Sequence, residues 1–289
     1  MSAEADKKTP LLNKQAPSAG PAKPQFKLYW ELARMHKFPA GTNLVFWPSV
    51  WGYLLGTREN PPDMTTLARY TMAFLVAATL LHSAACTIND ICDRDFDRQV
   101  ERCKHRPIAS GGHGLPGDGF SSHPGRHLRV DAGTSEPHGL PLWDAWLGFA
   151  MNWGFPTAWL IAKPEDIKSI PLWALTLGTV WLVDRKDDVE AGVKSTALLF
   201  GAYVKPILSV FGAVFIGTLA YVGMDTSMAL PYFVLGVGGC ALHMVWQLGT
   251  LDVSAPEDCW KKFKSNGHLG LIVAAGMSAA IYSPDLLKV

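Results

Sequence analysis

Seven long apolar runs dominate this chain of 289 residues and restrict the folds that it can adopt. Most of them approach the roughly 20 residues that a helix needs to cross a bilayer, although the fourth is too short by that rule. Helices satisfy their own backbone hydrogen bonds in lipid, so the runs predict an all-α, multi-span transmembrane bundle. The runs cover residues 43–56, 67–88, 143–162, 170–183, 199–222, 228–251 and 267–283.

Basic residues gather in four places, and seven spans put all four on the same side of the bilayer. The positive-inside rule makes that side cytosolic. The net charge of +1 gives no reason to expect a nucleic-acid partner. The four groups are Lys27, Arg34 and Lys37; Arg98, Arg102, Lys104 and Arg106; Arg185, Lys186 and Lys194; and Lys261, Lys262 and Lys264.

The N-terminal segment, residues 1–26, is rich in Lys, Pro and Ala and has no apolar core. It resembles neither a signal peptide nor a typical mitochondrial transit peptide, so we expect a disordered cytosolic tail. Residues 27–289 are then one transmembrane domain. The five cysteines have no metal-binding spacing and are expected to be reduced.

An acidic cluster ends the second apolar run. On a continuous helix, Asn89, Asp93 and Asp97 fall at positions i, i+4 and i+8, and Asp90 lies seven residues before Asp97. Ionisable groups at the mouth of a membrane helix are costly and are therefore functional candidates. Oxygen ligands in this pattern suit Mg²⁺, which bridges readily to phosphates.

A second acidic cluster, Asp184, Asp187 and Asp188, follows the run 170–183 in the same way. Two such clusters facing each other would clamp a diphosphate through shared magnesium ions. The simpler interpretation is that each cluster is a solvated helix end. An EF-hand starting at Asp93 is excluded, because Arg98 and Lys104 occupy the positions of its glycine and glutamate.

These motifs resemble those of the UbiA superfamily of intramembrane aromatic prenyltransferases. The resemblance covers about residues 27–111 and 146–284. Within the superfamily, the chain is similar to the 4-hydroxybenzoate polyprenyltransferase branch and looks most like fungal meroterpenoid members. The stretches that carry it are Arg34-Met-His-Lys37-Phe-Pro-Ala-Gly41, Asn89-Asp-x-x-Asp93-x-x-x-Asp97, Lys104-His-Arg106-Pro-Ile-Ala-Ser110, Asp184-x-x-x-Asp188 with Lys194, and Pro256 to Asn266.

The resemblance implies nine spans around a central cavity, of which about seven are recognisable here. It implies Mg²⁺ as cofactor, with a prenyl diphosphate, a small aromatic or pyrone acceptor and the lipid bilayer as partners. By the same match, the metal and diphosphate residues are Asn89, Asp93, Asp97, Asp184 and Asp188. Asp90 and Asp187 would support substrate binding, and Lys104, Arg106 and Lys194 would contact the diphosphate. Arg34 would orient the acceptor or serve only as a positive-inside anchor.

Residues 112–142 depart from the family pattern. This segment is rich in Gly, Pro and His, has no helical period and cannot span a bilayer. It is either a long cytosolic loop or intron-derived or out-of-frame sequence in place of two helices, and the abrupt change in composition favours the second. His123 and His127 have a zinc-like spacing, but nothing completes a set of four ligands.

The resemblance implies transfer of a farnesyl or geranylgeranyl group to an aromatic or pyrone acceptor in terpenoid or meroterpenoid biosynthesis. One alternative is 4-hydroxybenzoate polyprenyl transfer in ubiquinone biosynthesis, and another is a catalytically inactive, truncated relative. A third alternative is a soluble magnesium enzyme, which would be supported only if the protein were recovered from cytosol without detergent. We expect an ER-like endomembrane location with cytosolic acidic loops, and the mitochondrial inner membrane as the alternative.

Overall fold

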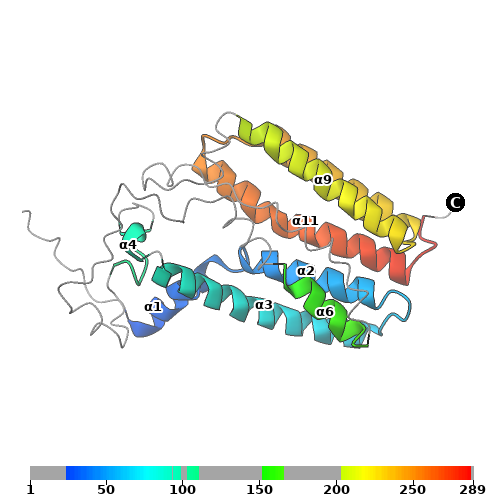
Figure 1. The fold of residues 1–289 in the computed structure, drawn as a ribbon, viewed down its shortest axis with the longest axis horizontal. Coiled ribbons are helices and arrows are strands. Elements are labelled where there is room, and N and C mark those ends of the chain that lie inside the picture. Colours follow the sequence, from blue (N-terminus) through cyan, green and yellow to red (C-terminus); the bar gives the residue numbers. More distant parts are fainter. Residues whose placement is uncertain (1–23, 93, 99–102, 111–151, 166–202, 288–289) are drawn as a thin grey trace, which may run out of the picture.

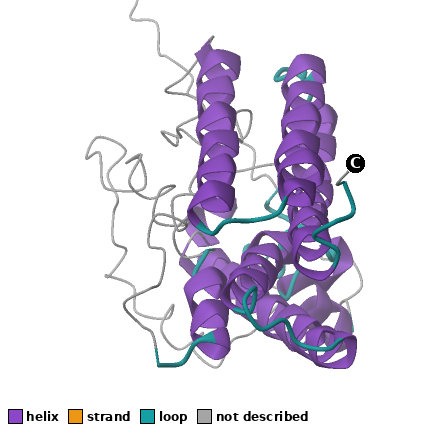
Figure 2. Ribbon diagram, turned by 90° about the vertical axis from the view of Figure 1, so that its right-hand side faces the viewer, coloured by secondary structure: helices purple, strands orange, loops and turns teal. Residues whose placement is uncertain are grey.

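The computed structural model describes residues 24–92, 94–98, 103–110, 152–165 and 203–287. Throughout these ranges the regular structure is helical and includes no strand, which confirms the predicted all-α class (Figure 2). The elements are α1 (Gln25–Leu32), η1 (Met35–Lys37), α2 (Thr42–Gly56), α3 (Met64–Cys92), α4 (Arg94–Asp97), α6 (Gly154–Ala162), α9 (Val204–Asp225), η6 (Tyr232–Gly238), α10 (Gly239–Thr250) and α11 (Pro256–Tyr282).

The helices coincide with the predicted apolar runs wherever the structure describes them. Three helical stretches are long and apolar enough to cross a membrane: Met64–Ile91, Val204–Asp225 and Tyr232–Thr250. Shorter α2 matches the first run, α6 the end of the third and the second half of α11 the last. The run 170–183 and the segment 112–142 lie outside the described residues.

Two helix starts follow from local chemistry. Asp63 accepts hydrogen bonds from the backbone N–H groups of Thr65 and Thr66, at 2.9 and 3.0 Å, and so caps the beginning of α3. Helix α11 begins with Pro256, followed by Glu257 and Asp258 in its first turn. Proline lacks an N–H that would be unpaired there, and the acidic side chains complement the positive end of the helix dipole.

Helix α2 is the centre of the molecule (Figure 1). It packs against α3, α6 and α11, and nearly all of its residues from Val45 to Gly56 are buried. The Trp51 Nε1–H donates a hydrogen bond of 3.1 Å to the carbonyl of Gly270 in α11. In Figure 1, α9 lies on the side of α11 away from α3, and η6 and α10 contact both α9 and α11, so α2 and α11 lie between outer helices.

The outer helices expose large apolar side chains. On α3, Leu80 is 67% exposed, and on α10, Leu242 and Val245 are 74% and 71% exposed. These exposed apolar side chains lie on the helices that are long and apolar enough to cross a membrane. Lipid contact would account for their exposure.

A close backbone approach joins α11 to η6 at Gly276 and Gly236. A Cβ atom at Gly276 would lie 2.5 Å from both the Cα and the N of Gly236. Small residues at such crossings are what allow membrane helices to pack closely.

We expect Gly276→Ala to destabilise the bundle by about 1–3 kcal/mol, because the two backbones must separate to admit the methyl group. The thermal midpoint of the purified protein in detergent measures this effect. Gly249→Ala in α10 is the matched control, since a Cβ there meets nothing within 4 Å. An unchanged midpoint for Gly276→Ala would show that the packing at this crossing is loose.

Two segment boundaries differ from the sequence-based expectation. Helix α1 begins at Gln25, so the last two residues of the expected tail, residues 25–26, are helical. Helix α11 begins at Pro256, eleven residues before the last apolar run, and includes the basic group Lys261, Lys262 and Lys264. The apolar run covers only the second half of this helix, because the first half is rich in charged residues.

Candidate functional site

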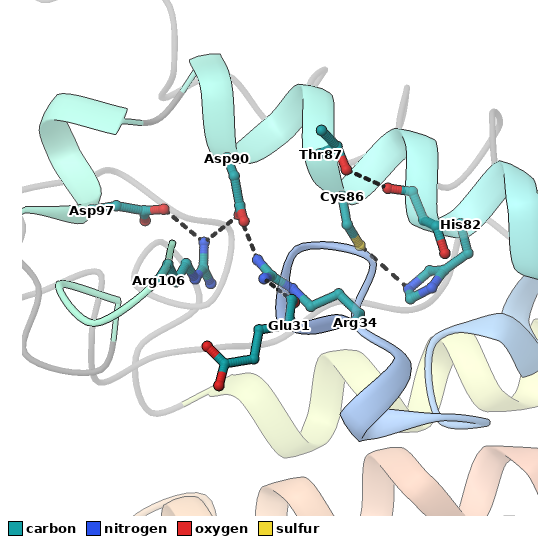
Figure 3. A network of polar contacts seen from close by, with 9 residues as sticks. Glu31, Arg34, His82, Cys86, Thr87, Asp90, Asp97 and Arg106 are labelled. Atoms are coloured by element: carbon teal, nitrogen blue, oxygen red, sulfur yellow. Dashed lines mark hydrogen bonds and ion pairs between the residues drawn. The ribbon is translucent and has the colours of Figure 1, made fainter. Parts of the chain in front are cut away.

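Four charged side chains meet at the end of α3 (Figure 3). Arg106 Nη1 donates to Asp97 Oδ2 at 2.8 Å and to Asp90 Oδ1 at 3.1 Å. Arg34 Nη2 donates to the same Oδ1 of Asp90. We call these residues, Arg34, Asp90, Asp97 and Arg106, the charged cluster. It joins the beginning of the chain, the first acidic motif and the segment after that motif.

Local backbone structure places the two arginines. Arg34 follows α1 and has a backbone φ of 57°, a left-handed conformation that residues other than glycine seldom adopt. Its Nη1 also lies 3.4 Å from the carbonyl oxygen of Glu31. Arg106 closes a turn in which its N–H donates to the carbonyl of Cys103 at 2.8 Å. Backbone strain of this kind is often found at functional sites, where surrounding contacts maintain it.

Burial makes the interactions in the cluster strong. The side chains of Asp90 and Asp97 are 1% and 10% exposed. Burial by itself acts to lower the pKa of the Arg106 guanidinium, but Cys103, Asp97 and Asp90 outweigh that effect and raise the pKa. Arg106 therefore stays charged at any physiological pH. Charge-assisted hydrogen bonds between buried groups are among the strongest that proteins make.

Two described helices carry the first acidic motif. Asn89 and Asp90 lie in α3 and Asp97 in α4, and Asp93 between them lies outside the described residues. Asn89 is exposed, whereas Asp90 and Asp97 are buried and share Arg106. The structure thus brings together the pair seven residues apart and turns Asn89 in another direction.

The other predicted site residues are only partly described. Lys104 is half-buried and lies in the same turn as Arg106, between Cys103 and the cluster. Five predicted residues lie outside the described ranges: Asp93, Asp184, Asp187, Asp188 and Lys194. The second acidic motif therefore has no described geometry.

The donor atoms near the cluster suit a hard cation. They are the carboxylate oxygens of Asp97 and the side-chain amide oxygen of Asn89, and Mg²⁺ takes oxygen ligands of this kind. Among the residues that the structure describes, no group of three or more His, Cys, Asp or Glu side chains is placed to hold a metal. The described residues therefore fit magnesium by the types of ligand atoms in the first motif. Asp93 and the second motif lie outside the described part.

Two polar residues that sequence reasoning missed lie on the same face of α3. His82 and Cys86 precede Asp90 by two turns and one turn, with His82 Nε2 3.5 Å from Cys86 Sγ (Figure 3). The imidazole lies directly against Gly41, where a Cβ would be 2.0 Å from Nε2. A histidine and a cysteine four residues apart inside an apolar run were the available signal.

A second polar group, also missed, joins α10 to α11. Gln247 Nε2 donates to Asn266 Oδ1 at 2.7 Å and to the carbonyl of Lys262 at 2.8 Å. The Lys262 ammonium lies 4.1 Å from the centre of the Trp246 ring. Polar side chains within membrane helices are stabilised by such partners and often have a function. The glutamine within the run 228–251 was the signal.

Three of the four basic groups lie at one end of the bundle. Arg34 and Arg106, from the first and second groups, share Asp90. Lys37 Nζ lies 5.6 Å from the centre of the Trp260 ring, which brings in the beginning of α11 and the fourth group. The third group, around residues 185–194, lies outside the described part. These three groups therefore lie together, as sharing one side of the bilayer would require.

Comparison with known proteins identifies the chain's family. The family model described as the UbiA prenyltransferase family matches residues 45–113 and 140–272. The unmatched stretch between these ranges falls within the Gly- and His-rich segment 112–142. The two matched ranges contain both acidic motifs.

Curated relatives match most of the chain. The UbiA prenyltransferase claS of Ampulloclitocybe clavipes is 40% identical over 86% of this chain and 88% of its own length. The mitochondrial 4-hydroxybenzoate polyprenyltransferase of Caenorhabditis elegans is 33% identical over 92% of this chain and 82% of its own length. The 4-hydroxybenzoate geranyltransferase 2 of Lithospermum erythrorhizon is 34% identical, with 86% and 89% covered. No solved structure matches. The chain belongs to the UbiA prenyltransferase family and is an integral membrane protein.

Proposed function

We propose that this protein transfers a farnesyl or geranylgeranyl group from its diphosphate to an aromatic or pyrone acceptor in terpenoid or meroterpenoid biosynthesis. The observation that carries the proposal is the charged cluster at the end of α3, in a chain of a prenyltransferase family. The isoprenoid tail would lie along the apolar helices in the bilayer, while the charged cluster would bind the diphosphate. The two substrates meet where apolar helix gives way to charged residues.

In this reaction the bond between C1 of the prenyl group and the diphosphate oxygen breaks, and its electron pair leaves with the diphosphate. A ring carbon of the acceptor forms a bond to C1 and then loses its proton. Arg106 and Lys104 would stabilise negative charge developing on the leaving group, with Lys194 as a third cation. Arg34 would orient an acidic or enolic acceptor beside them.

Magnesium, when bound, would neutralise the diphosphate and promote its departure. Asn89, Asp93 and Asp97 of the first motif and Asp184 and Asp188 of the second would hold it, and Asp187 would support the second motif. The carboxylate and amide oxygens in this set have the chemistry that Mg²⁺ prefers. Lipid-facing helices around the site would limit access of water to the allylic cation.

The acceptor and the location separate our proposal from its main alternative. Several relatives are named mitochondrial 4-hydroxybenzoate polyprenyltransferases, with identities between 33% and 36%. This observation favours ubiquinone biosynthesis in the mitochondrial inner membrane as the second candidate. Our proposal is an ER-like endomembrane location with the acidic motifs cytosolic, and its support is limited to sidedness, since the first acidic motif lies at the same end of the bundle as three basic groups.

The experiment is a product assay with the purified full-length protein in detergent, Mg²⁺ and a panel of substrates. The donors are farnesyl, geranylgeranyl and a long-chain polyprenyl diphosphate, and the acceptors are pyrones, phenols and 4-hydroxybenzoate. We expect product with farnesyl or geranylgeranyl diphosphate and a pyrone or phenol. Product only from 4-hydroxybenzoate and the long chain would establish the alternative. Absence of product throughout would identify an inactive relative, in which residues 112–142 replace necessary helices.

A further inference from the structure

Asp90 is the most enclosed member of the charged cluster and connects its two arginines. Its side chain is 1% exposed, against 12% for Arg34 and 24% for Arg106. A single oxygen, Oδ1, accepts hydrogen bonds from both guanidiniums (Figure 3). The arginines lie 56 and 16 residues away in the sequence. A shared contact of this kind holds the ends of two side chains from distant segments next to each other.

The charge on Asp90 is what allows the guanidiniums to approach. Two groups that donate to the same oxygen are close neighbours, and like charges repel strongly where little water separates them. Asp97 contacts Arg106 from a different helix but makes no described contact with Arg34. Asp90 is thus the one acid, among the described residues, that pairs with both arginines.

The placement of Asp90 differs from that of a metal ligand on the open face of the motif. Successive residues of an α-helix point about 100° apart, so Asn89 and Asp90 face different directions. Asn89 is exposed, whereas Asp90 points toward the segments that carry Arg34 and Arg106. Its second oxygen, Oδ2, is also enclosed and has no hydrogen-bond partner among the residues that the structure describes. Neither oxygen is exposed to a diphosphate arriving from water.

We propose that Asp90 is a positioning residue rather than a magnesium ligand. Its enclosed carboxylate fixes the Arg34 and Arg106 guanidiniums side by side at the end of α3, so that one faces the acceptor and the other the leaving diphosphate. The inference rests on the proposed function, because it assigns a role within the same site. It separates the adjacent residues Asn89 and Asp90, the first binding metal and the second organising the arginines.

The test is the steady-state kinetics of Asp90→Glu in the full-length protein, with farnesyl diphosphate, an acceptor that the wild type uses and varied Mg²⁺. Glutamate keeps the charge but moves the carboxylate by one methylene group. We expect kcat per folded enzyme to fall about 100-fold, the typical effect of misplacing a reacting group by about 1 Å. The magnesium concentration for half-maximal rate should stay at the wild-type value. Asp97→Asn is the reference and should raise that concentration on the order of tenfold or more.

Two results would overturn the proposal. Wild-type kcat in Asp90→Glu would mean that only the charge matters and not its position. A magnesium requirement raised as far as in Asp97→Asn would make Asp90 a metal ligand. A wild-type enzyme without any product is a different outcome, because it removes the proposed function itself.

Should Asp90→Glu fail to fold, Arg34→Lys and Arg106→Lys test the same contact from the other side. Each keeps its charge and loses the geometry of the guanidinium. Because Asp90 acts through the geometry of the two guanidiniums, each lysine variant should lose turnover while the magnesium concentration for half-maximal rate stays at the wild-type value. Wild-type turnover in both lysine variants would show that the guanidinium geometry is unnecessary and would contradict the proposal.

Discussion

Asp97→Asn should lower turnover by about three orders of magnitude at a fixed, physiological Mg²⁺ concentration. The substitution removes the charge that pairs with Arg106 and that we assign to the metal. A bound metal ion contributes several kcal/mol to stabilising the transition state, and each 1.4 kcal/mol or so is worth a factor of ten in rate. Asp93→Ala in the same motif and Asp188→Ala in the second motif should have losses of similar size. Product formation from labelled farnesyl diphosphate measures all three.

The matched control for this prediction is Asp63→Asn. Asp63 directly precedes α3 and caps the end of that helix opposite to the charged cluster. Asparagine is an equally good helix cap, so this substitution should leave the helix intact. Its turnover should equal that of the wild type. If Asp97→Asn, Asp93→Ala and Asp188→Ala also turned over at the wild-type rate, the assignment of a metal to the acidic motifs would be wrong.

Arg106→Gln is expected to have the second largest effect, a loss of roughly 10²–10³-fold in kcat. This is the usual consequence of removing one preorganised group that stabilises developing negative charge. Arg106 is the only described residue that bridges Asp90 and Asp97, so its loss also releases both carboxylates. The KM for the prenyl diphosphate should rise as well, because the same cation meets the diphosphate in the ground state. Initial rates at varied diphosphate and saturating acceptor measure both constants.

Arg58→Gln provides the comparison for Arg106→Gln. Arg58 pairs with the exposed Glu59 at the other end of the bundle, where an ion pair contributes little. Its kcat and KM should be those of the wild type. Equal kinetics in Arg106→Gln and Arg58→Gln would mean that the charged cluster maintains the fold without taking part in the reaction.

The fold was largely predictable because its determinants are spread along the chain. Apolar runs long enough to cross a bilayer require helices, and each described run contains one. The boundaries were less predictable: the charged first half of α11 has no apolar signal, yet it continues the same helix through Lys262 and Asn266. Helix α2 is only 15 residues long but packs against α3, α6 and α11. Hydrophobic periodicity within α2 does not reveal these long-range contacts.

The site was predictable in its residue types and less so in its geometry. The spacing of Asn89, Asp93 and Asp97 indicated one helical stripe, but it did not indicate that Asp90 and Asp97 would share Arg106 while Asn89 stays exposed. Long-range contacts decide the rest, since Arg34 reaches Asp90 across 56 residues. The partnership of Gln247 with Asn266 depends on how α10 packs on α11 and has no local sequence signature beyond a polar residue in an apolar run.

The most direct test of the account is the response of product formation to magnesium. Purified full-length protein in detergent would be given labelled farnesyl diphosphate and an accepted phenol or pyrone, first with excess EDTA and then with Mg²⁺ restored. We predict that prenylated product falls to background in EDTA and returns to its initial rate when Mg²⁺ is added. Undiminished product formation in EDTA would contradict the claim that acidic residues at the helix ends hold the diphosphate through a divalent ion.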